Sequence, residues 1–307
     1  MNGDALPLGG GIVSALVTPF DAGGQVDTGA LDALIDFQVE RSVDGLFVLG
    51  TSGEGLLLSP AERGKVVEQV LARAGDRIPV AVHCGAADTA TATELVSDAA
   101  GAGARTVAAI PPLFFAYNDQ GIRDHFERLA EAAPGIDHYL YDNPARVGYS
   151  IGADLARRLV DEVPCIRGVK DTGDSLGRIT TYLATRSEMR VFTGNNVIVL
   201  GALVMGAVGA VSTTANAVPE LFAGLYAAFQ SGDLAKARDL QLVAARLQEA
   251  LAGLPYIAAA KHLLAMRKLP GGHTHAPLPE LADDQRTALD GRVTGDPTLA
   301  SWLAPVS

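Results

Sequence analysis

The sequence has little cysteine, a deficit of basic residues and no long uninterrupted apolar run. Its two cysteines, Cys84 and Cys165, are too few for a disulfide framework or a cysteine-based zinc site, so we expect both to be small buried apolar residues. With 24 Lys and Arg against 35 Asp and Glu, the net charge is −11, which argues against sequence-independent binding of nucleic acid. Glycines and charges interrupt every Ala- and Val-rich stretch, so no transmembrane helix is expected.

Metal-ligand spacing is also lacking. The six histidines show no HExxH pattern, and His273-Thr-His275 is a weak candidate because it lies in a Gly- and Pro-rich loop. We therefore expect no metal and no cofactor. The first ten residues have neither a basic segment nor an apolar core, so we expect no secretion signal. We expect a cytoplasmic location.

Short β-branched runs alternate with longer amphipathic runs from residue 12 to residue 230. The predicted strands are 12–17, 45–49, 79–83, 106–110, 138–141, 166–170, 190–193 and 209–212. The predicted helices between and after them are 28–40, 60–74, 89–102, 120–132, 153–161, 176–185, 197–205 and 219–230. The strands are almost wholly apolar, as expected when both faces of a parallel sheet are buried.

Eight β-then-α units favour a closed (β/α)₈ barrel, the TIM barrel, over an open doubly wound sheet, which is the alternative. Three further helical patterns, 234–252, 257–267 and 283–290, follow the last unit. We expect a catalytic barrel over residues 11–231 and a C-terminal helical extension over 232–292. Residues 1–10 and 293–307 would be terminal tails.

Lys170 ends the apolar run 166–170 and is followed at once by turn residues. Active sites of such barrels lie at the carboxyl ends of the strands. A lysine there has a desolvated amine, which can be neutral and nucleophilic. The alternative is a buried lysine whose charge is paired, for example with Asp171.

Other reactive side chains occupy the ends of other strands. The loop Gly50-Thr-Ser-Gly-Glu-Gly55 offers backbone N–H groups and two hydroxyls, which suit a carboxylate or phosphate; it is not a P-loop, and it can also be an ordinary turn. Tyr141 can carry protons or can be a core residue. Arg146 offers a planar fork for a carboxylate or a surface ion pair.

With these residues in place, the sequence resembles the dihydrodipicolinate synthase / N-acetylneuraminate lyase family over about residues 11–292. The resemblance rests on motifs in a fixed order: Val17-Thr-Pro-Phe20, Gly50-Thr-Ser-Gly-Glu54, Tyr141-Asp-Asn-Pro144 with Arg146, Gly168-Val-Lys-Asp171 and Gly209-Ala-Val-Ser212 leading to Ala215-Asn216. It implies a TIM barrel and a class I, pyruvate-dependent lyase or aldolase.

The resemblance also implies roles for individual residues. Lys170 would form a Schiff base with pyruvate or another 2-oxo acid, Tyr141 would shuttle protons, and Thr51 would complete the catalytic set. The implied substrate-binding residues are Ser52, Arg146, Val211, Gly50 and Gly194. In the synthase branch, an arginine at the position of Arg146 grips the carboxylate of the aldehyde partner.

The sequence departs from the family pattern at two places. Phe114 stands where the synthase branch has a relay tyrosine that enters from a neighbouring subunit, and nothing in the sequence shows that Tyr117 substitutes for it. Gly194-Asn-Asn196 replaces Gly-Asp-Asp, which removes two acids near the entrance. Both changes weigh against 4-hydroxy-tetrahydrodipicolinate synthase activity, and neither touches the Schiff-base residues.

Three functions stay open. The first is an enzyme most like 4-hydroxy-tetrahydrodipicolinate synthase, joining pyruvate to aspartate semialdehyde. The second is an aldolase or dehydratase for a 2-keto-3-deoxy sugar acid or a 4-hydroxy-2-oxo acid. The third is a non-catalytic barrel that binds an oxo acid. The expected partners are small molecules, without nucleic acid or membrane, and the resemblance implies a homotetramer built as a dimer of dimers.

Overall fold

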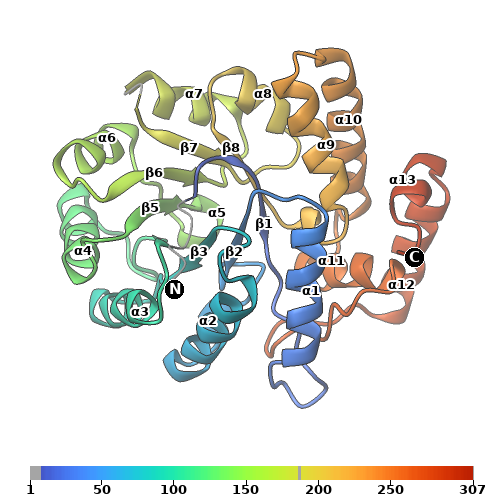
Figure 1. Cartoon of the computed structure of the whole chain (residues 1–307), viewed down its shortest axis with the longest axis horizontal. Helices are drawn as coiled ribbons and strands as arrows, with labels where there is room; N and C mark the ends of the chain where they lie inside the picture. Colours follow the sequence, from blue (N-terminus) through green and yellow to red (C-terminus); the bar gives the residue numbers. More distant parts are fainter. Residues whose placement is uncertain (1–7, 186–187, 307) are drawn as a thin grey trace.

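The computed structural model describes residues 8–185 and 188–306, so residues 1–7 and 307 of the expected tails lie outside the described part. Eight parallel strands form a closed barrel in chain order (Figure 1). The strands are β1 (Gly11–Ala15), β2 (Gly45–Val48), β3 (Val80–His83), β4 (Thr106–Ala109), β5 (Asp137–Asp142), β6 (Ile166–Asp171), β7 (Arg190–Thr193) and β8 (Gly209–Ser212). Closure between β1 and β8 confirms the TIM barrel and excludes the open sheet.

Helices surround the barrel and continue beyond it. They are α1 (Thr28–Glu40), α2 (Pro60–Ala74), α3 (Thr89–Gly101), α4 (Asp119–Ala132), α5 (Pro144–Val147), α6 (Ala153–Glu162), α7 (Leu176–Thr185), α8 (Val199–Val204), α9 (Pro219–Gln230), α10 (Leu234–Ala250), α11 (Tyr256–Met266), α12 (Asp283–Thr294) and α13 (Pro297–Trp302). Two 3₁₀ turns, Gly55–Leu57 and Thr214–Asn216, follow β2 and β8.

Local chemistry explains where the helices begin. Ser59 caps α2 and exchanges hydrogen bonds with Glu62, while Pro60 occupies the first helical position. Asp27 and Asp88 cap α1 and α3 in the same way, because each carboxylate accepts a backbone N–H of the first turn. These caps fix the residue at which each helix begins, and so fix the end of the loop that precedes it.

One glycine is required by the barrel itself. A Cβ on Gly168 would lie 1.8 Å from the carbonyl oxygen of Arg190, so only glycine lets β6 lie against β7 at this point. Gly168 stands two residues before Lys170 on β6 and so secures the strand that carries it.

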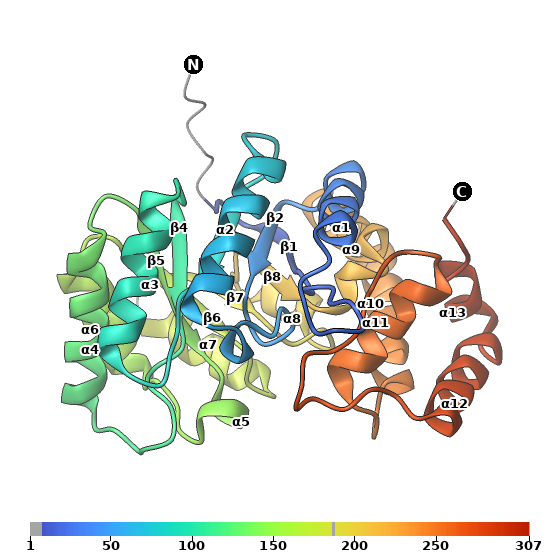
Figure 2. The same ribbon diagram turned by 90° about the horizontal axis from the view of Figure 1, so that it is seen from below.

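The C-terminal helices α10–α13 lie at one side of the barrel (Figures 1 and 2). α10 packs along α9, and α11 contacts the turn after β8. A buried ion pair ties α11 to the barrel, since Lys261 Nζ lies 2.5 Å from Glu54 Oε1 and also donates to the carbonyl oxygen of Thr18. The division of the chain at residue 231 into barrel and extension stays a prediction.

In the described part of the chain, no helix has the length and apolarity needed to cross a membrane.

Candidate active site

The centre of the site is a pair of neighbouring strands, β5 and β6. Their register places Tyr141 opposite Lys170 and Asp142 opposite Asp171. Because side chains alternate along a strand, the first pair points into the barrel and the second pair points toward the surrounding helices. The register therefore brings the two reactive residues together inside the barrel.

The amine of Lys170 is buried between aromatic rings. The residue is 5% exposed, and its Nζ lies 3.6 Å from the centroid of the Tyr141 ring and 3.9 Å from that of Phe47. Burial lowers the pKa of this amine below its ordinary value, although the neighbouring Tyr141 opposes the shift. A lower pKa increases the fraction of the amine that is neutral and nucleophilic at a given pH.

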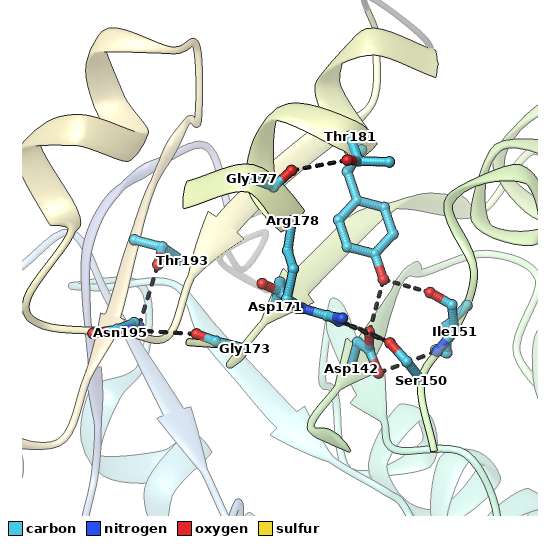
Figure 3. A network of polar contacts seen from close by, with 11 residues as sticks. Asp142, Ser150, Ile151, Asp171, Gly173, Gly177, Arg178, Thr181, Thr193 and Asn195 are labelled. Atoms are coloured by element: carbon cyan, nitrogen blue, oxygen red, sulfur yellow. Dashed lines mark hydrogen bonds and ion pairs between the residues drawn. The ribbon is translucent and has the colours of Figure 1, made fainter. Parts of the chain in front are cut away.

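The alternative in which Asp171 neutralises Lys170 does not hold. Asp171 lies on the opposite face of β6 and shares the guanidinium of Arg178 with Asp142 (Figure 3). Arg178 Nη2 lies 2.9 Å from Asp171 Oδ1, and the same nitrogen donates to Asp142 Oδ2. The two carboxylates behind the strands are thus held by a cation from α7, which leaves the lysine without a carboxylate partner among the described residues.

The Asp142 carboxylate accepts three further hydrogen bonds. Ser150 Oγ donates to Oδ2 at 2.5 Å, and the N–H of Ile151 donates to Oδ1 at 3.2 Å (Figure 3). Tyr182 Oη also donates to Oδ2, at 2.8 Å. Burial and the nearby Asp142 raise the pKa of Tyr182, so its hydroxyl stays protonated as a donor. This network fixes the ends of β5 and β6, and with them the spacing of Tyr141 and Lys170.

The Tyr141 hydroxyl lies within a set of polar side chains. Thr51 Oγ1 is 3.2 Å from Tyr141 Oη, and Asn143 Nδ2 donates to the same oxygen at 2.9 Å. Burial opposes ionisation of the phenol, but the charge of Lys170 and the bond to Thr51 together lower its pKa below the ordinary value. Such a phenol is suited to exchanging protons with a group bound beside Lys170.

The loop after β2 is built to a specific shape. Leu49 and Glu54 both adopt positive φ angles, 59° and 56°, so the chain turns tightly on either side of Thr51 and Ser52. Ser52 Oγ lies 2.6 Å from Thr213 Oγ1 in the loop after β8. The buried Glu54 binds Lys261, which anchors the loop to the extension.

A cavity of about 340 Å³ opens at these strand ends. All eight residues that the sequence singled out line it: Gly50, Thr51, Ser52, Tyr141, Arg146, Lys170, Gly194 and Val211. A larger hollow of about 430 Å³ lies between α2 and α3, but its lining contains no lysine and no tyrosine. The chemistry therefore places the candidate site in the smaller cavity.

Arg146 lies at the edge of this cavity. Arg146 falls between the predicted strand 138–141 and the predicted helix 153–161, and the structure places it on the four-residue helix α5, which lies beyond the end of β5 (Figure 2). Its side chain is exposed. It can contact the part of a substrate nearest to solvent, in contrast to the buried Lys170.

Several lining residues were not anticipated from the sequence. Asn143 belongs to a motif that was recognised, but its contact with Tyr141 was not. Gln248 and Tyr256, from α10 and α11, reach the cavity from the extension and carry no motif that marks them. The neutral His83 packs its ring against Tyr141 at 5.6 Å between centroids, and burial together with Arg63 holds its pKa well below the usual range.

Phe114 lies outside the cavity. It follows β4, has a φ of 77° and is 90% exposed, with its ring against that of Phe115. Tyr117 packs near Tyr149 and does not line the cavity either. Neither Phe114 nor Tyr117 therefore reaches the cavity of its own chain.

Among the described residues, no group of three or more His, Cys, Asp or Glu side chains is placed to hold a metal ion. The fold and this site define the class: a TIM-barrel protein whose candidate active site, at the carboxyl ends of the strands, contains a buried lysine and a buried tyrosine.

The comparisons with known proteins agree with this class. The model of the dihydrodipicolinate synthetase family matches residues 9–295. A protein of Streptomyces coelicolor named 4-hydroxy-tetrahydrodipicolinate synthase 1 is 37% identical over 288 residues, covering 93% of this chain and 92% of that protein. An N-acetylneuraminate lyase of Rhizobium meliloti is 32% identical over 297 residues, covering 97% of each.

A solved structure of YagE, an Escherichia coli prophage protein of the dihydrodipicolinic acid synthase family in complex with pyruvate, superposes with a TM-score of 0.90. It is 27% identical and covers 93% of this chain and 98% of its own. The chain belongs to the dihydrodipicolinate synthetase family and is a lyase of that family.

Proposed function

We propose that the protein is a class I lyase or aldolase that forms a Schiff base between Lys170 and pyruvate or a related 2-oxo acid. The observation that carries the proposal is the buried Lys170 amine, without a carboxylate partner among the described residues, with its Nζ 3.6 Å from the ring centroid of Tyr141. A buried lysine of purely structural use would pair its charge, as Lys261 does with Glu54. The pyruvate bound to the related YagE supports the same choice of substrate.

In the proposed reaction, the neutral Lys170 amine attacks the ketone carbon and gives a carbinolamine. Tyr141 donates a proton to the departing hydroxyl, water leaves, and a protonated imine remains. This imine is an electron sink, so loss of a proton from the adjacent carbon gives an enamine that attacks an aldehyde. Hydrolysis then releases the product and regenerates the amine; cleavage follows the same steps in reverse.

The other cavity residues would bind the oxo acid. Thr51 and Ser52 would hold its carboxylate through their hydroxyls and backbone N–H groups, because both kinds of group can donate hydrogen bonds to a carboxylate. The main chain of Val211, together with Gly50 and Gly194, would enclose the methyl end. These roles are predictions that follow from the position of each residue in the cavity.

The first candidate partner is aspartate semialdehyde, as in 4-hydroxy-tetrahydrodipicolinate synthase. The exposed Arg146 at the cavity edge favours it, since a guanidinium can bind the carboxylate of that aldehyde. The Streptomyces relative carries the name of this activity.

The second candidate is a 2-keto-3-deoxy sugar acid or a 4-hydroxy-2-oxo acid. The outward-facing Phe114, which has no hydroxyl, and the neutral Asn195 and Asn196 in the cavity wall favour it. The related N-acetylneuraminate lyase acts on a sugar acid by its name.

Borohydride trapping tests the shared chemistry. The protein is reduced with sodium borohydride in the presence of pyruvate, and intact mass and peptide mapping locate the adduct. We expect one reduced pyruvate on Lys170 and none on Lys261, the ion-paired internal control. Lys170→Ala should lose both adduct and turnover while remaining folded; substantial residual turnover in this variant would refute the Schiff base.

The homotetramer and the cytoplasmic location remain predictions. Phe114 and Phe115 are 90% and 64% exposed, and an exposed aromatic pair of this kind supports a subunit contact at the β4–α4 loop.

A further inference from the structure

The C-terminal extension contributes to the wall of the active-site cavity. Gln248 on α10 and Tyr256 on α11 line the same cavity as Lys170, next to Asn196 from the loop after β7. The extension therefore has a place in substrate contact in addition to packing on α9.

The amide of Gln248 is held in one orientation by two donors. Its Oε1 accepts from Asn196 Nδ2 at 3.2 Å and from Tyr256 Oη at 3.4 Å. Asn196 Nδ2 also donates to Thr214 Oγ1 at 3.0 Å. With its oxygen engaged, Gln248 has two N–H donors on Nε2 that meet no acceptor in the described chain.

Few charged side chains line the cavity. Besides Lys170, the charged lining residues are Arg146 and Asp174, which are both exposed and opposite in sign. The wall near Gln248 is made of amides and hydroxyls. Such groups match the hydroxyls of a substrate, which both donate and accept hydrogen bonds.

We propose that Gln248 is a specificity-determining residue, and that it binds a hydroxyl group of the aldehyde partner or of the corresponding part of a longer 2-oxo acid. This inference rests on the proposed Schiff-base function and selects its second candidate partner: the substrate is polyhydroxylated at the end remote from the imine. In this case Arg146 lines the rim of the site and does not bind a carboxylate of the aldehyde.

The test compares two aldehydes of equal length. Glyceraldehyde carries two hydroxyls and propanal carries none, and each is condensed with pyruvate by the whole protein while product is followed by chromatography. Loss of one hydrogen bond to a neutral hydroxyl lowers kcat/KM about tenfold. We therefore expect Gln248→Ala and Gln248→Met to lower kcat/KM for glyceraldehyde about tenfold and to leave that for propanal within about twofold. Gln248→Met keeps the length of the side chain, so it guards against a packing defect.

Gln69→Ala is the matched control. Gln69 Nε2 ties α2 to α1 through the Thr28 carbonyl at 2.7 Å and Asp32 Oδ1 at 2.9 Å, and it does not line the cavity. This variant should leave the ratio of the two aldehydes unchanged. An unchanged ratio in both Gln248 variants would overturn the inference, as would a wild-type preference for aspartate semialdehyde over glyceraldehyde. Failure of pyruvate trapping on wild-type Lys170 would instead overturn the proposed function on which it rests.

Discussion

Replacing Arg178 by methionine should remove the cation that two buried carboxylates share. Asp142 and Asp171 are 0% and 1% exposed, so neither can recover its hydration in the folded protein. Breaking a buried ion pair on one side costs about 3–5 kcal/mol of unfolding free energy. Methionine keeps most of the apolar contacts of the arginine stem, so the loss reports on charge.

The two carboxylates should respond differently. Asp142 keeps its hydrogen bonds from Ser150, Tyr182 and the Ile151 N–H, whereas Asp171 loses both side-chain bonds from Arg178. Burial already raises the pKa of Asp171 against the opposing effect of Arg178. Arg178→Met raises the pKa of Asp171 further. Between the unfolded and the folded pKa, the folded state therefore keeps a proton on Asp171 that the unfolded chain has released. Stability then falls as the pH rises from about 4 toward the folded pKa, by up to about 1.4 kcal/mol per pH unit.

Urea unfolding followed by far-UV circular dichroism at about pH 4 and about pH 8 measures this dependence. We expect Arg178→Met to be destabilised at both values and more strongly at the higher one. Arg238→Met, which breaks an exposed pair with Asp239, should show no measurable change at either pH. An equal loss for Arg178→Met at both values, or a loss under about 1 kcal/mol, would refute the buried-charge argument.

Two predictions concern catalysis. Tyr141→Phe should lower kcat by a factor of about 10²–10⁴, because it removes a positioned proton carrier. A steady-state assay of the condensation measures kcat. A rate within a few-fold of wild type would assign the proton transfer to another group. Arg146→Ala should raise the apparent KM for the aldehyde more than that for pyruvate, because the side chain lies at the rim of the cavity. Equal effects on both substrates in a two-substrate titration would deny Arg146 a role in aldehyde binding.

Much of the barrel followed from local pattern. The predicted bounds of α1, α2, α7 and α9 agree with the structure, since caps such as Ser59 with Glu62 and the proline at 60 mark a helix start within a few residues. The helix expected at 197–205 is shorter, Val199–Val204. The four-residue α5 was not predicted because so short a segment has no periodicity to read.

The sequence by itself determined the chemistry that depends on position along a strand. Lys170 and Tyr141 end apolar runs, and in a parallel barrel all such ends meet at one rim, so their approach follows from the order of the elements. The tertiary structure decided what depends on register and long-range packing. The position of α7 brought Arg178 to Asp142 and Asp171, and the docking of α10 brought Gln248 to the cavity. No local pattern encodes these contacts, because each joins residues whose proximity arises only when the barrel closes and the extension packs against it.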